Sequence, residues 1–542
     1  MTNPIVSVNV NVIAAPSPST LQKTGAFISQ GATNTSAGTK SLLTRLSDLT
    51  PLLVGAATIA SITWSGNLAT VTTSAPHELS GSLPVTIAGA APAGYNGTFY
   101  ATVTGASTFT YSLLVNPGTE TTPGVWTVED VAELLAMATT FFAQGSQQAV
   151  YVLECGEGNA TEGVAFLTAW IAANPGVFYS YLVPRFWDGN AAFLTMLGNF
   201  NNTTSKTYFF VTTTLQNYSL YTAMMKCCVA MVEAPNYGAW PANELTALSQ
   251  TSGTASATTT TNHGVLPGQY FTLSGNLPAG YNGTFLALQG TATDALVFNV
   301  PSATGAETQL GTLVQSQYAS GGIPSTEFSL AAVFWVTLNY KPSSTNKVTP
   351  LNLSYLFGVT PFPTQGNATL LSTLNTANVN VVGTGAQGGL SAAILIGGNN
   401  KDGNPFNYWY SIDWVQVTVD TNITAALIAA ANNPQNPIYY NQPGINALQQ
   451  VAVSTMNNGI SFGLVLNTVK GTTLDAEDFQ VALDSDTYEG YSIVNAEPFS
   501  AYVEENPDDY AAGVYDGISI DYTPQIGFES ITIFISVSQF AS

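Results

Sequence analysis

Positive charge is scarce in this chain, which has 10 Lys and Arg against 32 Asp and Glu and a formal net charge of −22. Binding to nucleic acid or to an anionic membrane surface needs clustered basic side chains, and these ten are scattered from Lys23 to Lys470. The composition therefore predicts neither a nucleic-acid partner nor a membrane partner. The sequence also has no signal-peptide pattern and no apolar run of about 18 residues, so we expect synthesis and assembly in a cytoplasm.

Histidine and cysteine are rarer still, with two and three residues. Cys155, Cys227 and Cys228 do not make a disulfide framework, which is typical of a reducing compartment. Because the only histidines, His77 and His263, both lie in a repeated segment, a histidine-based triad or metal centre in the rest of the chain is excluded. We expect a protein that is not an enzyme, with no catalytic residue, no cofactor and no metal.

Two motifs that suggest ligand binding are better explained as turns. Gly383-Thr-Gly385-Ala-Gln-Gly388 matches the dinucleotide fingerprint, but neither a convincing helix nor an acidic residue at ribose distance follows it. Residues 484–489 resemble a calcium loop without its glycine and final glutamate, which leaves a metal there as a minor alternative. Asp508, Asp509 and Asp516 are interpreted as solvated turn residues.

Acidic residues gather late in the chain, with 14 of the 32 between Asp475 and Glu529 and no Lys or Arg after Lys470. The simplest interpretation is a solvated acidic face. The alternative is a surface that meets a basic partner and sets its orientation.

One small module occurs twice. PAGYNGTF appears at Pro92–Phe99 and Pro278–Phe285, and an ungapped alignment of 77–99 with 263–285 gives 11 identities in 23. The repeat predicts two all-β, sandwich-like domains inserted at 58–122 and 250–315, with Asn-Gly hairpin turns. The candidate turn residues of the two copies are His77, Tyr95, Asn96, Gly97, His263, Tyr281, Asn282 and Gly283.

The remaining sequence alternates helical and strand patterns, which indicates an α/β core with a largely parallel sheet in an α+β/α/β multidomain chain. We divide it into an N-terminal arm with the start of the core (1–57), two core segments (123–249 and 316–470) and a C-terminal part (471–542). Helices are expected near 41–53, 243–248, 412–431 and 445–457. Residues 476–540 are expected to be mainly β.

Both ends of the chain have the period-two pattern of a strand. Apolar residues alternate with Ser, Asn or Thr in both, apart from Phe534. Such ends can pair within their own subunit, or they can complete a sheet in a neighbour. The candidate intersubunit residues are Val6, Val8, Val10, Val12, Ile531, Ile533, Ile535 and Val537.

Several stretches outside the repeats carry a resemblance to a known family. They are Tyr208–Thr212, Asn375–Val382 with its glycine turn, Ile412-Asp413-Trp414, and Tyr515–Ile518 before the terminal strand. In this order the host chain, without the two modules, resembles the contractile tail-sheath proteins of myoviruses. The likeness is diffuse and covers about residues 1–50, 127–245 and 325–542.

The resemblance implies a bacteriophage virion protein, assembled in the host cytoplasm, that polymerises with itself into a helical sheath of six-subunit rings. Its other implied partners are the tail tube, baseplate and tail terminator proteins. Contraction from a metastable extended state would drive the tube through the host envelope during genome ejection. The alternative is a tail fibre or adhesin-like protein whose duplicated modules bind host glycans.

Overall fold

The structure is a computed structural model that describes residues 24–527, apart from short stretches within that range. The predicted strands at the two chain ends, 6–12 and 531–537, therefore lie outside the described residues. The internal stretches left out are 54–56, 67, 78–81, 114–115, 146–148, 157–159, 214–216, 232–242, 261–262, 264, 266–269, 289, 293, 301–303, 316–326, 339–341, 363–367 and 388–389.

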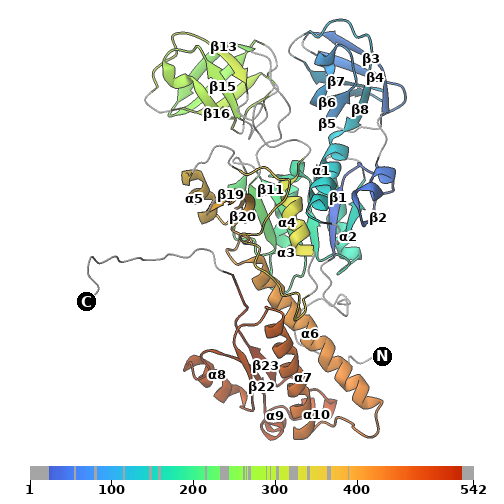
Figure 1. Cartoon of the computed structure of the whole chain (residues 1–542), viewed down its shortest axis with the longest axis vertical. Coiled ribbons are helices and arrows are strands. Elements are labelled where there is room, and N and C mark those ends of the chain that lie inside the picture. The colour runs from blue at the N-terminus through green and yellow to red at the C-terminus, as the bar shows by residue number, and fades with distance from the viewer. Residues whose placement is uncertain are drawn as a thin grey trace, which may run out of the picture.

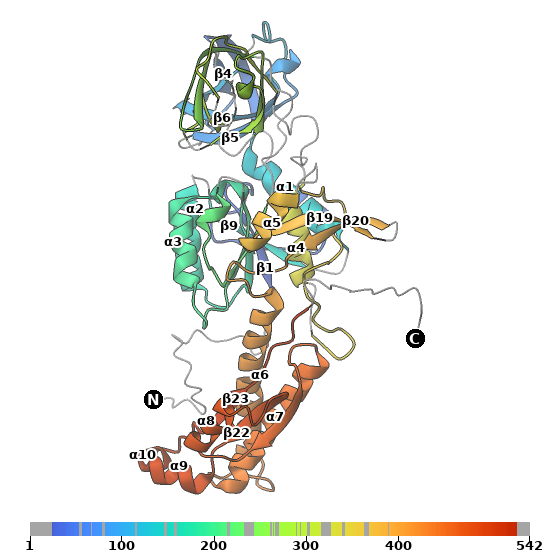
Figure 2. The same cartoon turned by 90° about the vertical axis from the view of Figure 1, so that its left-hand side faces the viewer.

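The chain forms a mixed α/β structure with several sheets, arranged in three tiers (Figures 1 and 2). Two all-β units lie at one end, and an α/β sheet occupies the middle. The long helix α6 (Phe406–Ala431) leads from this sheet to a C-terminal domain at the other end.

The middle tier is built on an eight-stranded sheet of order β2-β9-β1-β10-β11-β12-β19-β20. The six inner strands run parallel, while the edge strands β2 and β20 pair antiparallel. The strands are β1 (Gly25–Ser29), β2 (Lys40–Leu43), β9 (Val150–Glu154), β10 (Ser180–Leu182), β11 (Tyr208–Thr213), β12 (Cys227–Met231), β19 (Asn380–Gln387) and β20 (Leu390–Ile396).

Helices cover both faces of this sheet, which explains why its inner strands are apolar at nearly every position. Phe210 points into one core and its neighbour Phe209 into the other. Helices α1 (Glu129–Ala143) and α4 (Ser329–Leu338) cover the first face. On the second face lie α2 (Ala160–Ala173), α3 (Ala191–Phe200) and α5 (Ala368–Thr376).

The helix expected near 41–53 is absent, because this segment pairs at the sheet edge instead. Residues Lys40–Leu43 form β2 against β9, and two 3-10 turns follow at Leu46–Asp48 and Thr50–Leu52. Pro51 lies within the second turn, where its ring prevents a continuous helix.

The first repeat folds as a closed barrel of order β3-β4-β7-β6-β5-β8. Its core is separate from that of the α/β sheet and contains Val71, Phe109 and Tyr111. The strands are β3 (Ala57–Ser65), β4 (Leu68–Thr73), β5 (Ser82–Ala88), β6 (Gly97–Gly105), β7 (Thr108–Ser112) and β8 (Val125–Val128).

The second repeat has the same circular strand order, β16-β15-β18-β13-β14-β17, without a described pairing between β16 and β17. Its own core includes Phe271, Leu296 and Phe298. The strands are β13 (Asn243–Thr251), β14 (Thr254–Thr259), β15 (Tyr270–Ser274), β16 (Gly283–Leu286), β17 (Ala295–Asn299) and β18 (Thr312–Gln315).

Three sequence expectations about these units are wrong. A closed ring of six strands in the first unit, and a six-stranded sheet of the same order in the second, replace the expected sandwich, because the last strand of each unit pairs with its first. The first unit therefore extends past 122 to include β8, and the second begins before 250. The expected helix at 243–248 is part of β13, which pairs antiparallel with β14 and β18.

The C-terminal domain packs helix α7 (Gln442–Ser461) against both α6 and a three-stranded sheet of order β21-β22-β23. Residues 476–540 were expected to be mainly β, but three short helices join the strands because Asp475 and Pro507 begin helices. The strands are β21 (Thr468–Thr472), β22 (Tyr491–Ala496) and β23 (Ile518–Asp521), and the helices are α8 (Ala476–Asp484), α9 (Phe499–Glu505) and α10 (Pro507–Ala512).

Candidate assembly surfaces and buried polar sites

The C-terminal sheet has two outer edges that pair with no other strand in the described part of the chain. Its central strand β22 pairs parallel with β21 and antiparallel with β23. At one end the flanking segments pair directly, since the Leu466 N–H donates to the Thr523 carbonyl at 2.9 Å. An unpaired edge presents backbone donors and acceptors to an incoming strand.

Helix α7 packs against one face of this sheet and is hydrogen-bonded to two of its strands. The Gln449 side chain donates to the carbonyls of Thr472 in β21 and Val494 in β22, at 2.7 and 2.9 Å. Strand β22 is buried from Ser492 onward, whereas β21 and β23 consist of half-buried and exposed residues. The sheet is thus fixed to α7 through its central region, and its two outer edges at β21 and β23 are accessible.

The repeated string forms the same clamped turn in both β units. Asn96 accepts from the Ala90 N–H and donates to the Ala90 carbonyl, both at 2.8 Å. Asn282 makes the same two bonds with Asn276 at 2.8 Å. The expected two-residue hairpins are replaced by longer connections, with a 3-10 turn at 93–95 or 279–281 before the next strand.

The tyrosine of each string anchors the turn to a distant loop. Tyr95 donates through its hydroxyl to the Gly118 carbonyl at 2.7 Å, and Tyr281 donates to the Gly305 carbonyl at 2.9 Å. Both rings are buried. Gly97 begins β6, and Gly283 begins β16 with φ of 134°, a conformation that favours glycine.

Both histidines are buried structural groups. The Nε2 of His77 lies 3.2 Å from the Thr108 carbonyl, and its ring contacts Phe109 and Trp126 edge-on. His263 accepts at Nδ1 from the Val265 N–H at 3.0 Å. Burial lowers the pKa of His263 to about 4, against smaller opposing effects of the Ala295 carbonyl and Asp294. The repeated residues therefore stabilise the module fold.

A buried polar cluster, which the sequence did not reveal, joins α6 to the parallel sheet. Asp413 Oδ2 accepts from the hydroxyls of Tyr179 at 3.0 Å and Tyr208 at 2.8 Å. Lys226 Nζ in turn donates to the Tyr208 hydroxyl at 2.8 Å and lies over the Trp409 ring. We call these residues the Asp413 cluster.

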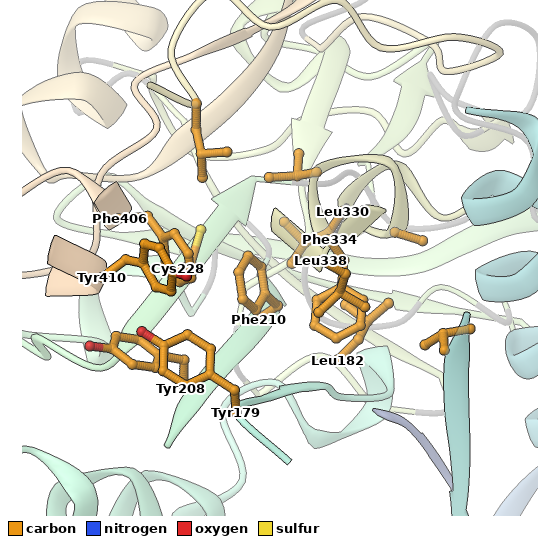
Figure 3. Packing of buried hydrophobic residues seen from close by; sticks show 14 of the residues in the cluster. Tyr179, Leu182, Tyr208, Phe210, Cys228, Leu330, Phe334, Leu338, Phe406 and Tyr410 are labelled. Atoms are coloured by element: carbon orange, nitrogen blue, oxygen red, sulfur yellow. The ribbon is translucent and has the colours of Figure 1, made fainter. Parts of the chain in front are cut away.

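Burial shifts the pKa values of both ionisable residues of this cluster, Asp413 and Lys226. Desolvation raises the pKa of Asp413, while Lys226 and Lys206 oppose the rise. The pKa of Lys226 is lowered by the same burial, with Asp413 opposing. Figure 3 shows the aromatic surroundings, where Phe210 lies between Phe334 of α4 and Phe406 of α6.

The sequence contained one signal for this cluster. Tyr179, Tyr208 and Lys226 directly precede or begin three neighbouring parallel strands, so their side chains meet at one edge of the sheet. Lys226 is one of ten basic residues and stands immediately before the apolar Cys227–Met231 strand. A lysine in such a position needs a counter-charge, but only the fold shows that Asp413 supplies it.

The motifs considered for chemistry have structural surroundings. Gly383 and Gly385 lie within β19, which forms an antiparallel hairpin with β20 instead of opening a helix. Burial raises the pKa of Cys155, Cys227 and Cys228, which disfavours their reactive thiolates.

The acidic residues near the C-terminus are partly engaged in contacts. Asp509 and Asp516 share the Tyr502 hydroxyl as a hydrogen-bond donor. Asp516 is exposed outside any helix or strand, as predicted, whereas Asp508 and Asp509 lie in helix α10 and not in a turn. Across the described residues, no group of three or more His, Cys, Asp and Glu could hold a metal ion. Within the same range, no helix is long and apolar enough to cross a membrane.

Comparisons with known proteins were made for the whole chain. Neither a family model nor a curated protein matches it. Solved structures do match, among them the crystal structure of a sheath tail protein from Listeria innocua, with 8% identity over 82% of this chain and 86% of that chain. The TM-score of 0.33 is too low to carry an argument about fold or function. The function proposed below is therefore argued from the residues of this chain.

Proposed function

We propose that this chain is a structural, non-enzymatic subunit that polymerises into the helical contractile sheath around a phage tail tube. The observation that carries the proposal is the C-terminal sheet, whose outer edges at β21 and β23 have no strand partner among the described residues. The chain also carries two ends, 6–12 and 531–537, whose sequences have the period-two pattern of a strand.

Strand exchange of this kind produces polymers. A strand that leaves its own subunit and completes a neighbour's sheet uses one surface on each partner, and such head-to-tail contacts form open helical assemblies when the rotation does not close. A charged content of only 8% reduces repulsion between closely packed copies. In this proposal subunits stay linked through their strands while their other contacts change during contraction.

The partners follow from the same proposal. The polymer surrounds the tail tube and contacts baseplate and tail terminator proteins, with assembly in the host cytoplasm and a final location in the virion tail. The energy for contraction is stored during assembly, so no nucleotide or other cofactor takes part.

The proposal is tested by removing the ability of one end to form a strand. Proline has no N–H to donate, so a Val8→Pro and Asn9→Pro double variant should abolish polymers in negative-stain electron microscopy while the monomer stays folded by circular dichroism. Ser17→Pro with Ser19→Pro is the matched control, because Pro16 and Pro18 already interrupt that segment. Tubes from the first variant, or strictly monomeric wild-type protein at high concentration, would contradict the proposal.

A second candidate is a tail fibre or adhesin in which the two β units bind host glycans. The observation in its favour is that both copies keep the same clamped turn and lie together at one end of the molecule (Figure 1). It predicts binding to host cells by unpolymerised protein and loss of that binding when one unit is removed. Equal binding with and without the units would exclude it.

A further inference from the structure

An exposed apolar face lies on the outer side of β20. Leu353, Tyr355 and Phe357 are 56%, 60% and 62% exposed, whereas Leu356 is buried. Tyr355 is the residue of this segment that bridges to β20, and Leu353 and Phe357 lie in the turns before and after it, so three exposed apolar side chains follow one another within five residues. We call these three side chains the 353–357 face.

This segment is held in place like an additional edge strand. The Leu353 N–H donates to the Leu395 carbonyl at 2.8 Å, and the Leu356 N–H donates to the Ala393 carbonyl at 3.0 Å. At its far end, the Gln144 side chain accepts from the Phe357 N–H at 2.8 Å and donates to the Phe357 carbonyl at 2.6 Å. The apolar side chains are therefore displayed by an ordered backbone.

The backbone of Tyr355 faces outward. Tyr355 forms an antiparallel bridge with Ile394, and the bonds to β20 come from residues on either side of it. In an antiparallel ladder, such a residue directs its own N–H and carbonyl away from the strand that its neighbours bond. The segment thus offers one backbone donor, one acceptor and an apolar face to an incoming strand.

The C-terminal end of the chain leaves the described structure beside this face. Gln525 is fixed to α6, because its carbonyl accepts from the Asn407 side chain at 2.8 Å. A β-carbon on Gly527 would come within 2.3 Å of the Pro350 ring, so the Gly527 backbone lies directly against that side chain. Pro350 precedes the turn that leads to Leu353, and Ile526 adds a further side chain that is 57% exposed.

The sequence beyond Gly527 fits this face in chemistry and reach. Residues 528–542 carry only one charged side chain, Glu529, and place Ile531, Ile533, Ile535 and Val537 on one side. Four residues of extended chain span about 14 Å, which is enough to bring Ile531 from the Pro350 contact to the 353–357 face. A tethered segment also has an effective concentration on the order of millimolar, well above that of a free partner.

We propose that in the unassembled subunit residues 528–542 dock in cis on the 353–357 face, as an added strand beside Tyr355. Docking covers exposed apolar side chains and occupies the terminal strand. If the chain polymerises as proposed above, docking also withholds this strand from neighbouring sheets until assembly offers a better edge. Only this regulatory consequence rests on the proposed function.

The test is hydrogen exchange of the Tyr355 N–H in the full chain. An Ile533→Asp and Ile535→Asp double variant places charge on the docking side and should speed this exchange about tenfold or more. Thr532→Asp with Ser536→Asp is the matched control, because it adds the same charge to the opposite side and should leave the exchange slow. Equal exchange in wild type and both variants would overturn the proposal.

Concentration separates the cis occupant from a neighbouring copy. Protection of the Tyr355 N–H that is independent of protein concentration supports docking in cis, and protection that disappears on dilution overturns it. Electron microscopy of the same samples scores polymers separately. Slow exchange of the Tyr355 N–H in a sample without polymers would support docking and count against the proposed sheath function. Fast exchange in the dilute monomer of a protein that does form polymers would support the sheath function and overturn docking.

Discussion

At the scale of single residues, the Asp413 cluster shows how a charge is kept inside an apolar region. The carboxylate has two hydroxyl donors, and Lys226 reaches it through Tyr208. Because both ions are removed from water, the pair is costly to form, but removing one member is costlier since it leaves the other buried without a counter-charge. The cluster therefore fixes the position of α6 against the sheet.

Asp413→Leu should destabilise the α/β part of the chain by about 3–5 kcal/mol, because Lys226 then stays buried without its carboxylate. Tyr179→Phe should cost less, about 1.5–3 kcal/mol, since it removes one hydrogen bond to a charged group. Hydrogen exchange of the β10, β11 and β12 amides measures both changes. Asp420→Asn, further along α6, is the control and should change stability by less than about 0.5 kcal/mol. Unchanged exchange in Asp413→Leu would refute this role.

His263 predicts a pH dependence for the second β unit. Its folded pKa of about 4 lies below the ordinary histidine value of 6.5, so the unfolded unit binds the proton more tightly. The stabilisation is complete above pH 6.5 and is lost as the pH falls from 6.5 to 4, by about 2 kcal/mol at pH 5. Hydrogen exchange of β14 and β17 between pH 7 and pH 5, corrected for intrinsic rates, should show this loss. His263→Phe should remove the pH dependence; an unaltered profile would contradict the assignment.

At the scale of elements, the clamped turns show why the string PAGYNGTF is repeated. Each asparagine closes the connection between two paired strands by bonding both backbone groups of one residue. The repeated string thus has a local folding role, which is a simpler explanation of the repeat than a shared ligand.

Asn96→Ala and Asn282→Ala should each destabilise their own β unit by about 1–3 kcal/mol, because buried backbone groups lose their partners. Each change should leave the other unit unaffected, since the two hydrophobic cores are separate. Hydrogen exchange of β5 and β6 against β15 and β16 in the same sample provides the internal control. Equal destabilisation of both units by one substitution would show that they fold together.

At the scale of the whole molecule, the two β units occur within connections of the α/β sheet. The first lies in the chain between the neighbouring strands β2 and β9, and the second lies between the neighbouring strands β12 and β19. In both cases the framework strands pair without any strand of the β units. The framework therefore does not need the units to complete its sheet.

Replacing residues 57–128 or 243–315 by a short Gly-Ser linker should leave the remaining chain folded and, if the chain polymerises as proposed, should leave its polymers unchanged. The physical reason is that the first and last strands of each unit pair, so the points where the chain enters and leaves the unit lie close together and a short loop can join them at little cost. Circular dichroism and negative-stain electron microscopy measure the two outcomes. Folded protein that no longer polymerises would place the β units in the assembly contacts, contrary to this prediction.

Much of this organisation could be predicted from sequence, and the misses have identifiable causes. Period-two and apolar runs indicated β1, β9, β10 and β11, and the repeat indicated two β units. Residues 243–248 were predicted as helix because strand β13 is recognisable only beside β14 and β18. Residues 476–512 were predicted as β because short helices that begin at Asp475 or Pro507 are too brief to show a helical period.

The alternation of α and β elements, the duplication of one module and the scarcity of groups suited to catalysis are all visible in the sequence, because they depend on local pattern and composition. Tertiary structure alone decided which distant residues meet. It paired Asp413 with tyrosines more than 200 residues away, closed six strands into a ring, and brought Gly527 beside Pro350. Such contacts are set by the packing of whole elements, and a local period carries no information about them.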